Sequence, residues 1–89
     1  MTAVLGLPRR LEGNALEPLK EQILAMRGQD LDLAGDDVER VNGLGVELLL
    51  ATFRTWREDG VKLRIVEPTT VLMDVFDRLS LGLSAGEAA

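Results

Sequence analysis

The chain has 89 residues and a formal net charge of -5, from 10 Lys and Arg against 15 Asp and Glu, and it contains no cysteine and no histidine. Without cysteine there is no disulfide, thiolate nucleophile, zinc ribbon or iron–sulfur cluster, and without histidine the commonest metal ligand and general base are missing. The acidic balance also disfavours nucleic-acid binding, which depends on Lys and Arg.

The first quarter of the chain predicts a strand followed by a helix. Residues 3–7 are apolar and end at Pro8, which indicates an edge strand. Apolar residues then recur at helical spacing over residues 16–26, with Asn14 as the candidate N-cap and Gly28 as the glycine that follows the helix.

The remaining elements continue this alternation. Residues 30–33 alternate Asp and Leu with the period of a half-buried strand. A helix over residues 43–59 ends at Gly60, a second alternating strand covers residues 61–65, and a last helix spans about residues 69–79. The order strand, helix, strand, helix, strand, helix predicts an α/β fold with a small, mainly parallel sheet of three or four strands, covered by helices mostly on one face.

The length suits a single domain over residues 1–89, and we expect its core at about residues 3–81 and a flexible tail at residues 82–89. No segment is apolar over the roughly 20 residues that a membrane span needs, and none has the pattern of a secretory signal. We therefore expect a cytoplasmic protein that does not insert into the membrane.

Four segments occur in a fixed order around the second predicted strand. Residues 11–19 are Leu-Glu-Gly-Asn-Ala-Leu-Glu-Pro-Leu, and residues 31–34 are Leu-Asp-Leu-Ala. After a short loop, residues 38–51 are Val-Glu-Arg-Val-Asn-Gly-Leu-Gly-Val-Glu-Leu-Leu-Leu-Ala, and residues 60–69 are Gly-Val-Lys-Leu-Arg-Ile-Val-Glu-Pro-Thr. Over residues 7–81 the chain thereby resembles a STAS domain, the family of the anti-sigma factor antagonists and of the cytoplasmic tails of sulfate transporters.

The resemblance includes two departures from the family pattern. The family usually has Asp-Ser-Ser-Gly where this chain has Asn42, Gly43, Leu44 and Gly45, so Gly43 stands at the position of the serine that related antagonists offer for phosphorylation. Phosphorylation at that position is chemically impossible here. The amino-terminal hairpin of the family is also shortened in this chain, which puts in doubt any partner contact that uses the hairpin.

A narrower resemblance is carried by residues 25–28, 37–41 and 54–60, which are similar to small STAS proteins found with chemotaxis genes in alphaproteobacteria. It implies a STAS-like interaction module in bacterial signalling, without enzyme activity or cofactor, whose partner is a histidine-kinase-type protein, either a chemotaxis kinase or an anti-sigma factor kinase. The alternative is the STAS subunit of a phospholipid-trafficking ABC transporter, which would bind the ATPase. The direction of regulation and the oligomeric state stay open.

We expect the partner to bind at the start of the second long helix and along one side of it. Val46, Leu50 and Arg54 follow each other at intervals of four residues and form a row beside the core face, which is either an interface or part of a widely buried helix. The full set of candidate partner-binding residues is Asn42, Gly43, Leu44, Gly45, Val46, Glu47, Leu50 and Arg54.

Each of these features has a plainer alternative. Asn42 is most simply the N-cap of the helix, and the pair Gly43 and Gly45 either binds an anion or allows close packing, which we favour. Phe53 and Trp56 are expected in the core rather than as anchors for a partner.

The charged side chains have structural explanations as well. Asp30, Asp32, Asp36 and Asp37 form either a solvated acidic edge, which we favour, or a site for magnesium or calcium. A cation-dependent hydrolase is the remote alternative, because nothing beside these carboxylates supplies a nucleophile. We therefore expect no catalytic residue and no metal ligand. The pair at residues 9–10, both Arg, is expected to protect the edge strand from aggregation.

Overall fold

A computed structural model describes residues 2–78 of the chain. In chain order the elements are β1 (Ala3–Gly6), β2 (Arg10–Leu11), the 3-10 helix η1 (Gly13–Ala15), α1 (Leu16–Ala25), β3 (Leu31–Ala34), β4 (Arg40–Val41), α2 (Gly43–Asp59), β5 (Leu63–Val66) and α3 (Thr70–Arg78). The predicted alternation of strands and helices is confirmed, with the short strands β2 and β4 added to it. The predicted tail and Leu79 lie outside the described residues.

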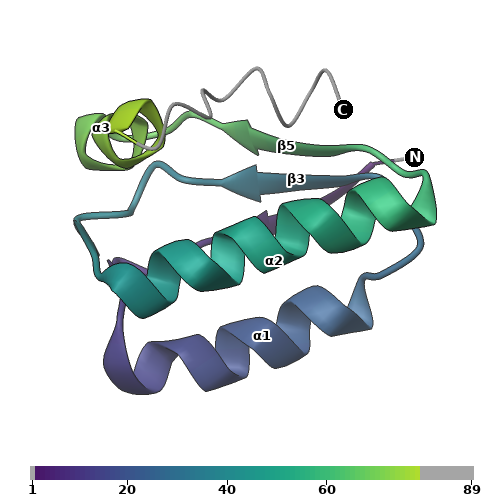
Figure 1. The fold of residues 1–89 in the computed structure, drawn as a ribbon, viewed down its shortest axis with the longest axis horizontal. Coiled ribbons are helices and arrows are strands. Elements are labelled where there is room, and N and C mark those ends of the chain that lie inside the picture. Colours follow the sequence, from purple (N-terminus) through teal and green to yellow (C-terminus); the bar gives the residue numbers. More distant parts are fainter. Residues whose placement is uncertain (1, 79–89) are drawn as a thin grey trace.

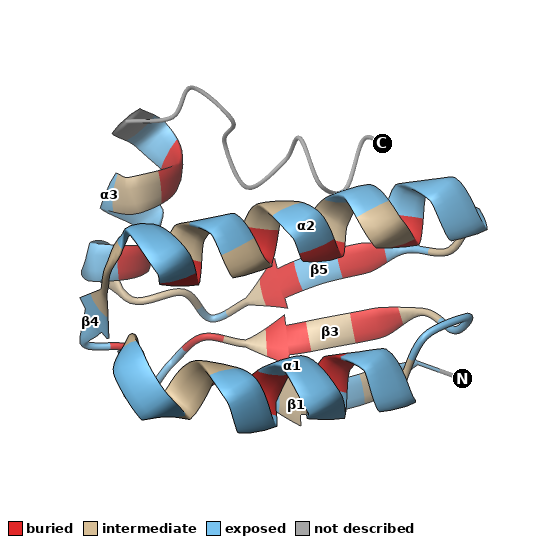
Figure 2. Cartoon of the chain, turned by 60° about the horizontal axis from the view of Figure 1, so that its bottom comes forward, coloured by how far each residue is buried: buried red, intermediate tan, exposed pale blue. Residues whose placement is uncertain are grey.

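The main sheet is parallel, as predicted, and its strand order is β1-β3-β5 (Figure 1). Both crossovers step in the same direction across the sheet, and right-handed crossovers then place their helices on the same face. Figure 2 shows α1 and α2 together in front of this sheet. The fold is therefore a small α/β unit with one helical layer on a three-stranded sheet.

The core lies between this sheet and the helices. Alternation along the strands buries Leu31 and Leu33 of β3 while Asp32 points to the other face. The buried apolar residues are Leu7, Leu11, Leu19, Ile23, Leu31, Leu33, Val38, Leu49, Trp56, Leu63, Ile65, Leu72 and Phe76. Phe53 is only partly buried, and its ring meets that of Phe76 edge-on at 5.8 Å between centroids, which joins α2 to α3.

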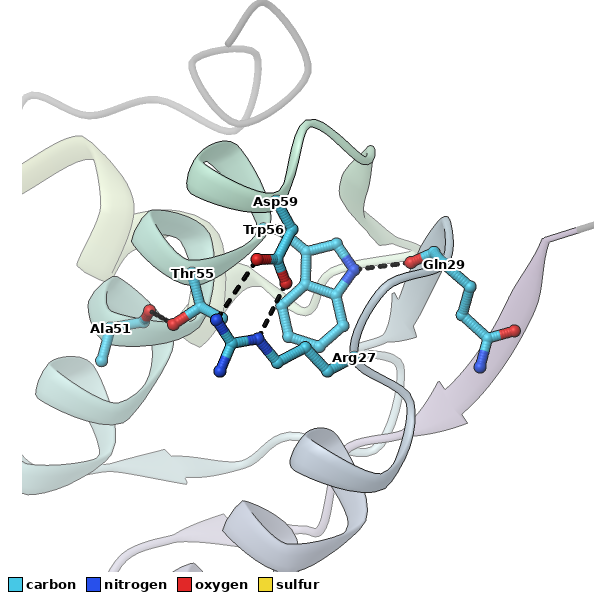
Figure 3. Close-up of polar contacts among 6 residues, drawn as sticks. All are labelled: Arg27, Gln29, Ala51, Thr55, Trp56 and Asp59. Carbon is cyan, nitrogen blue, oxygen red and sulfur yellow. Dashed lines mark hydrogen bonds and ion pairs between the residues drawn. The ribbon is translucent and has the colours of Figure 1, made fainter.

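Polar contacts join the loop before β3 to the C-terminal end of α2 (Figure 3). The indole Nε1 of Trp56 donates a hydrogen bond of 2.7 Å to the carbonyl oxygen of Gln29. Arg27 donates from Nε and Nη2 to the two carboxylate oxygens of Asp59, at 2.8 and 3.2 Å. This hydrogen bonding, with the charge of Arg27, lowers the pKa of Asp59 below its ordinary value.

Three local predictions were wrong. The N-cap of α1 is Ala15, without a side-chain cap, because the 3-10 helix η1 takes up the residues around Asn14. Gly28 has a positive φ of 89° but lies two residues beyond the C-cap Met26, so it turns the loop rather than ending the helix. The strand predicted at residues 61–65 is β5, which begins at Leu63.

Candidate functional site

The candidate site lies at the edge where the parallel strands end. The chain leaves β3 and returns through β4 into the N-terminus of α2, so residues 42–45 lie at this carboxyl edge of the sheet (Figure 1). Both crossovers step in one direction, so this edge lacks the crevice that forms where the strand order of an open α/β sheet reverses. The candidate site is therefore the surface of the helix start and the loops beside it.

Asn42 is the N-cap of α2, as its type and position predict. Its backbone is extended, with φ -103° and ψ 179°, and its Oδ1 accepts a hydrogen bond of 2.9 Å from the N–H of Gly45. The N–H of Asn42 donates to the carbonyl oxygen of Leu11 at 3.2 Å. The cap therefore fixes the start of α2 against β2.

The two glycines of the site have different surroundings. Gly45 is buried, and a Cβ atom there would overlap the carbonyl oxygen of Leu11. Gly43 is exposed, and a Cβ atom there would meet nothing within 4 Å. Gly45 thus serves the close packing of α2 on β2, and its N–H is occupied by Asn42. Only Gly43 leaves room for a side chain.

The candidate residues divide into an outward row and a flank. Leu44, Glu47 and Arg54 follow at intervals of three and seven residues on the outward face of α2, and all three are exposed. Leu44 is 62% exposed, a large value for a leucine. Val46 and Leu50 lie on the flank and are partly buried, so the row predicted with Arg54 is not uniformly exposed.

The short strands β2 and β4 pair in parallel beside this site, although nothing in the sequence predicts this pairing. The carbonyl oxygen of Arg9 accepts hydrogen bonds from the N–H groups of Glu39 at 2.7 Å and Arg40 at 3.2 Å. The Arg9 side chain pairs with Glu39 at 2.8 Å, and Arg40 lies 3.9 Å from Glu12. These contacts place residues 9–10 beside β4 and the start of α2, not along the outer edge of β1, which they were expected to protect.

The loop before α3 reaches the same edge of the molecule. Thr69 donates from Oγ1 to the carbonyl oxygen of Val38 at 2.7 Å and accepts from the N–H of Leu72 at 3.3 Å, so it caps α3 and ties this helix to the β3–β4 loop. Glu67, the first residue of this loop, has a φ of 50°, which is uncommon for a residue other than glycine.

The four aspartates do not gather into one cluster. Asp30 accepts a hydrogen bond of 3.0 Å from the N–H of Lys62. Asp32 of β3 accepts two hydrogen bonds of 3.1 Å from the side chain of Arg64 on the neighbouring strand β5. The other two are exposed in the loop after β3. Over residues 2–78, no three His, Cys, Asp or Glu side chains come close enough to hold a metal ion.

Within the described residues, no helix has both the length and the apolar character needed to cross a membrane. Comparison with protein-family models, with curated proteins and with solved structures gives no match for this chain.

Proposed function

We propose that this chain is a STAS-like docking module in bacterial signalling, which binds a histidine-kinase-type partner and performs no catalysis. The motifs that resemble STAS domains support the partner class, and the three-helix α/β fold with a parallel sheet is compatible with it. The observation that carries the proposal is the exposed Leu44 in the first turn of α2, on a helix start held rigid by Asn42 and Gly45.

We call the outward residues Gly43, Leu44, Glu47 and Arg54 the docking face. Leu44 is a large apolar side chain that is exposed one turn from Glu47, and such a side chain can anchor an interface when a partner covers it. Glu47 and Arg54 carry opposite charges on the same row, and charges at the rim of an interface act on the association rate and on partner choice. The docking face therefore combines one apolar anchor with two steering charges.

In this proposal, any control of binding comes from the partner protein. The position of the family's phosphoacceptor serine is Gly43, which has no hydroxyl group, although the surrounding space would admit one. Binding at this face is therefore constitutive, or it follows the state of the partner. A negative charge placed at Gly43 would mimic the phosphate of the related antagonists.

The proposal is tested by affinity capture from the native host with the wild-type chain and two leucine variants. Leu44→Asp removes the anchor, and Leu24→Asp is the matched control, since Leu24 is 48% exposed near the far end of α1. We expect a histidine kinase or anti-sigma factor kinase to be captured by the wild type and by Leu24→Asp, but not by Leu44→Asp. Capture of an ABC-transporter ATPase in its place would overturn the proposal in favour of the transporter alternative.

A second pair of variants tests the position of the docking face once the partner is purified. Gly43→Ser adds a small neutral side chain in open space, and Gly43→Asp adds a charge at the same atom. We expect Gly43→Ser to bind like the wild type and Gly43→Asp to bind at least about tenfold more weakly, which corresponds to about 1.4 kcal/mol. Equal affinity of both variants would show that the partner does not contact this helix start.

A further inference from the structure

The outer edge of β1 is free of charge and exposes backbone groups. The N–H groups of Ala3 and Leu7 donate to the carbonyl oxygens of Asp30 and Ala34 at 3.0 and 2.9 Å, so the alternate residues turn their N–H and C=O groups outward. These residues are Val4 and Gly6, and both are exposed, Val4 to 62%. An edge strand of this kind is a template for another strand, and charged residues usually protect it.

Helix α1 lies beside β1 on the helical side of the sheet, and much of its surface is exposed (Figure 2). Ala15, Pro18, Gln22 and Ala25 follow each other at intervals of three or four residues and share one side of the helix. A hollow of about 280 Å³ lies between this row and β1, and its lining includes Gly6, Pro8, Ala15, Pro18, Leu19 and Gln22. Glu17 and Lys20 lie on other sides of α1, and the exposed Glu21, three residues after Pro18 and four before Ala25, borders the row. The uncharged strip is therefore the strand edge together with the side of α1 that faces it.

From this strip we infer that the chain forms a homodimer, in which β1 of one copy pairs antiparallel with β1 of the second. Two copies of a chain with a net charge of -5 repel each other, so they meet with least repulsion through a face without charge. An antiparallel strand edge is also complementary to itself, because a two-fold axis brings each outward N–H opposite an outward C=O.

The geometry of this dimer follows from the fold. Pairing β1 with its copy joins two three-stranded sheets into one continuous sheet. The two α1 helices then face each other across the two-fold axis with their uncharged rows. The hollow beside Gly6 and Pro8 lies along this seam, so β1 and α1 of the second copy cover its apolar lining. Strand addition supplies the hydrogen bonds, and the hollow supplies the apolar contact.

The inference is tested by sedimentation equilibrium over a wide range of concentration. The wild type is expected at twice the chain mass of 9.7 kDa. Val4→Pro removes an outward N–H without removing a bond to β3, and we expect it to weaken the dimer at least tenfold. Gln22→Glu places like charges on the two α1 helices near the two-fold axis and should also weaken the dimer at least tenfold. Gln29→Glu is its control, because it makes an equal change of charge at an exposed loop residue and should leave the dimer intact.

The two variants keep the test decisive. If Val4→Pro loses its circular dichroism signal, Gln22→Glu on the exposed side of α1 still tests the same face. A wild-type chain that stays monomeric at millimolar concentration overturns the inference. A dimer that persists in a folded Val4→Pro and in Gln22→Glu would use another face, and it overturns the inference as well.

Discussion

Gly45 of α2 lies directly against Leu11 of β2, so close that a Cβ atom on the glycine would overlap the leucine's carbonyl oxygen. That oxygen also accepts the N–H of Asn42. The contact joins two segments more than thirty residues apart and sets the height at which the start of α2 stands above the sheet. The exposure of Leu44 depends on this position.

The contact predicts opposite effects for two alanine substitutions. Gly45→Ala forces a methyl group into the backbone at Leu11, and overpacking of this kind costs about 1–3 kcal/mol of the free energy of unfolding. Gly43→Ala meets no atom within 4 Å and should stabilise the helix by about 0.5–1 kcal/mol, because it restricts the unfolded chain. Urea unfolding followed by circular dichroism measures both, and equal stabilities would contradict the packing of Gly45.

Two asparagines that resemble helix caps should respond differently to removal. Asn42→Ala loses the hydrogen bond from the N–H of Gly45 and should lower the free energy of unfolding by about 1 kcal/mol. Asn14→Ala should change it by less than about 0.5 kcal/mol, since Asn14 is exposed within η1 and the N-cap of α1 is Ala15. A larger loss for Asn14→Ala than for Asn42→Ala would mean that the caps are assigned wrongly.

The indole of Trp56 contributes a hydrogen bond as well as packing. Trp56→Phe removes the donor to the carbonyl oxygen of Gln29 and part of the buried ring, and should cost about 1–3 kcal/mol. Thr55→Ala removes a bond of 2.9 Å to the carbonyl oxygen of Ala51 at an exposed place on the same helix, so it should cost less than about 0.5 kcal/mol. Thermal unfolding of the two variants provides the comparison.

The pair of Arg27 and Asp59 makes stability depend on pH in the acidic range. The pKa of Asp59 is lowered in the folded chain by the hydrogen bond from Arg27, so at acidic pH the folded chain binds fewer protons at this carboxyl than the unfolded chain does. The stabilisation is fully present above the ordinary pKa of aspartate and is lost as the pH falls through the lowered value. The stability difference between the wild type and Asp59→Asn should therefore shrink on acidification, and added salt should reduce it at neutral pH.

A difference that stays constant from neutral pH to well below the ordinary pKa would contradict this role of Asp59. Arg27→Gln is the matched variant, because it removes the partner and keeps the carboxylate. Its stability should have a pH dependence closer to that of Asp59→Asn than to that of the wild type.

Local patterns were sufficient to predict most of the fold. The alternation of Asp32 and Leu33 marks β3, and the asparagine before a helical pattern marks the cap of α2. Each signal is contained in a few neighbouring residues. The parallel sheet then follows from the order of the elements, because strands separated by helices cannot form hairpins.

Pairing over long range was not predictable in the same way. Strands β2 and β4 have two residues each, which is too short to show a period, and Arg10 pairs with Arg40 only because α1 and β3 bring the two segments together. The exposure of α2 is a similar case. Helical spacing predicts where Leu44 and Leu50 lie around the axis of α2. Which of these positions faces solvent depends on the neighbouring elements, and spacing alone does not give it.

The burial of Trp56 allows the fold to be followed by intrinsic tryptophan fluorescence. The chain has one tryptophan and no tyrosine, and the indole is 1% exposed. Its fluorescence therefore comes from one place, beside Gln29, at the opposite end of α2 from Leu44. An unchanged emission spectrum in Leu44→Asp or Gly43→Asp would assign a loss of binding to the altered surface, without a label and in the same cuvette.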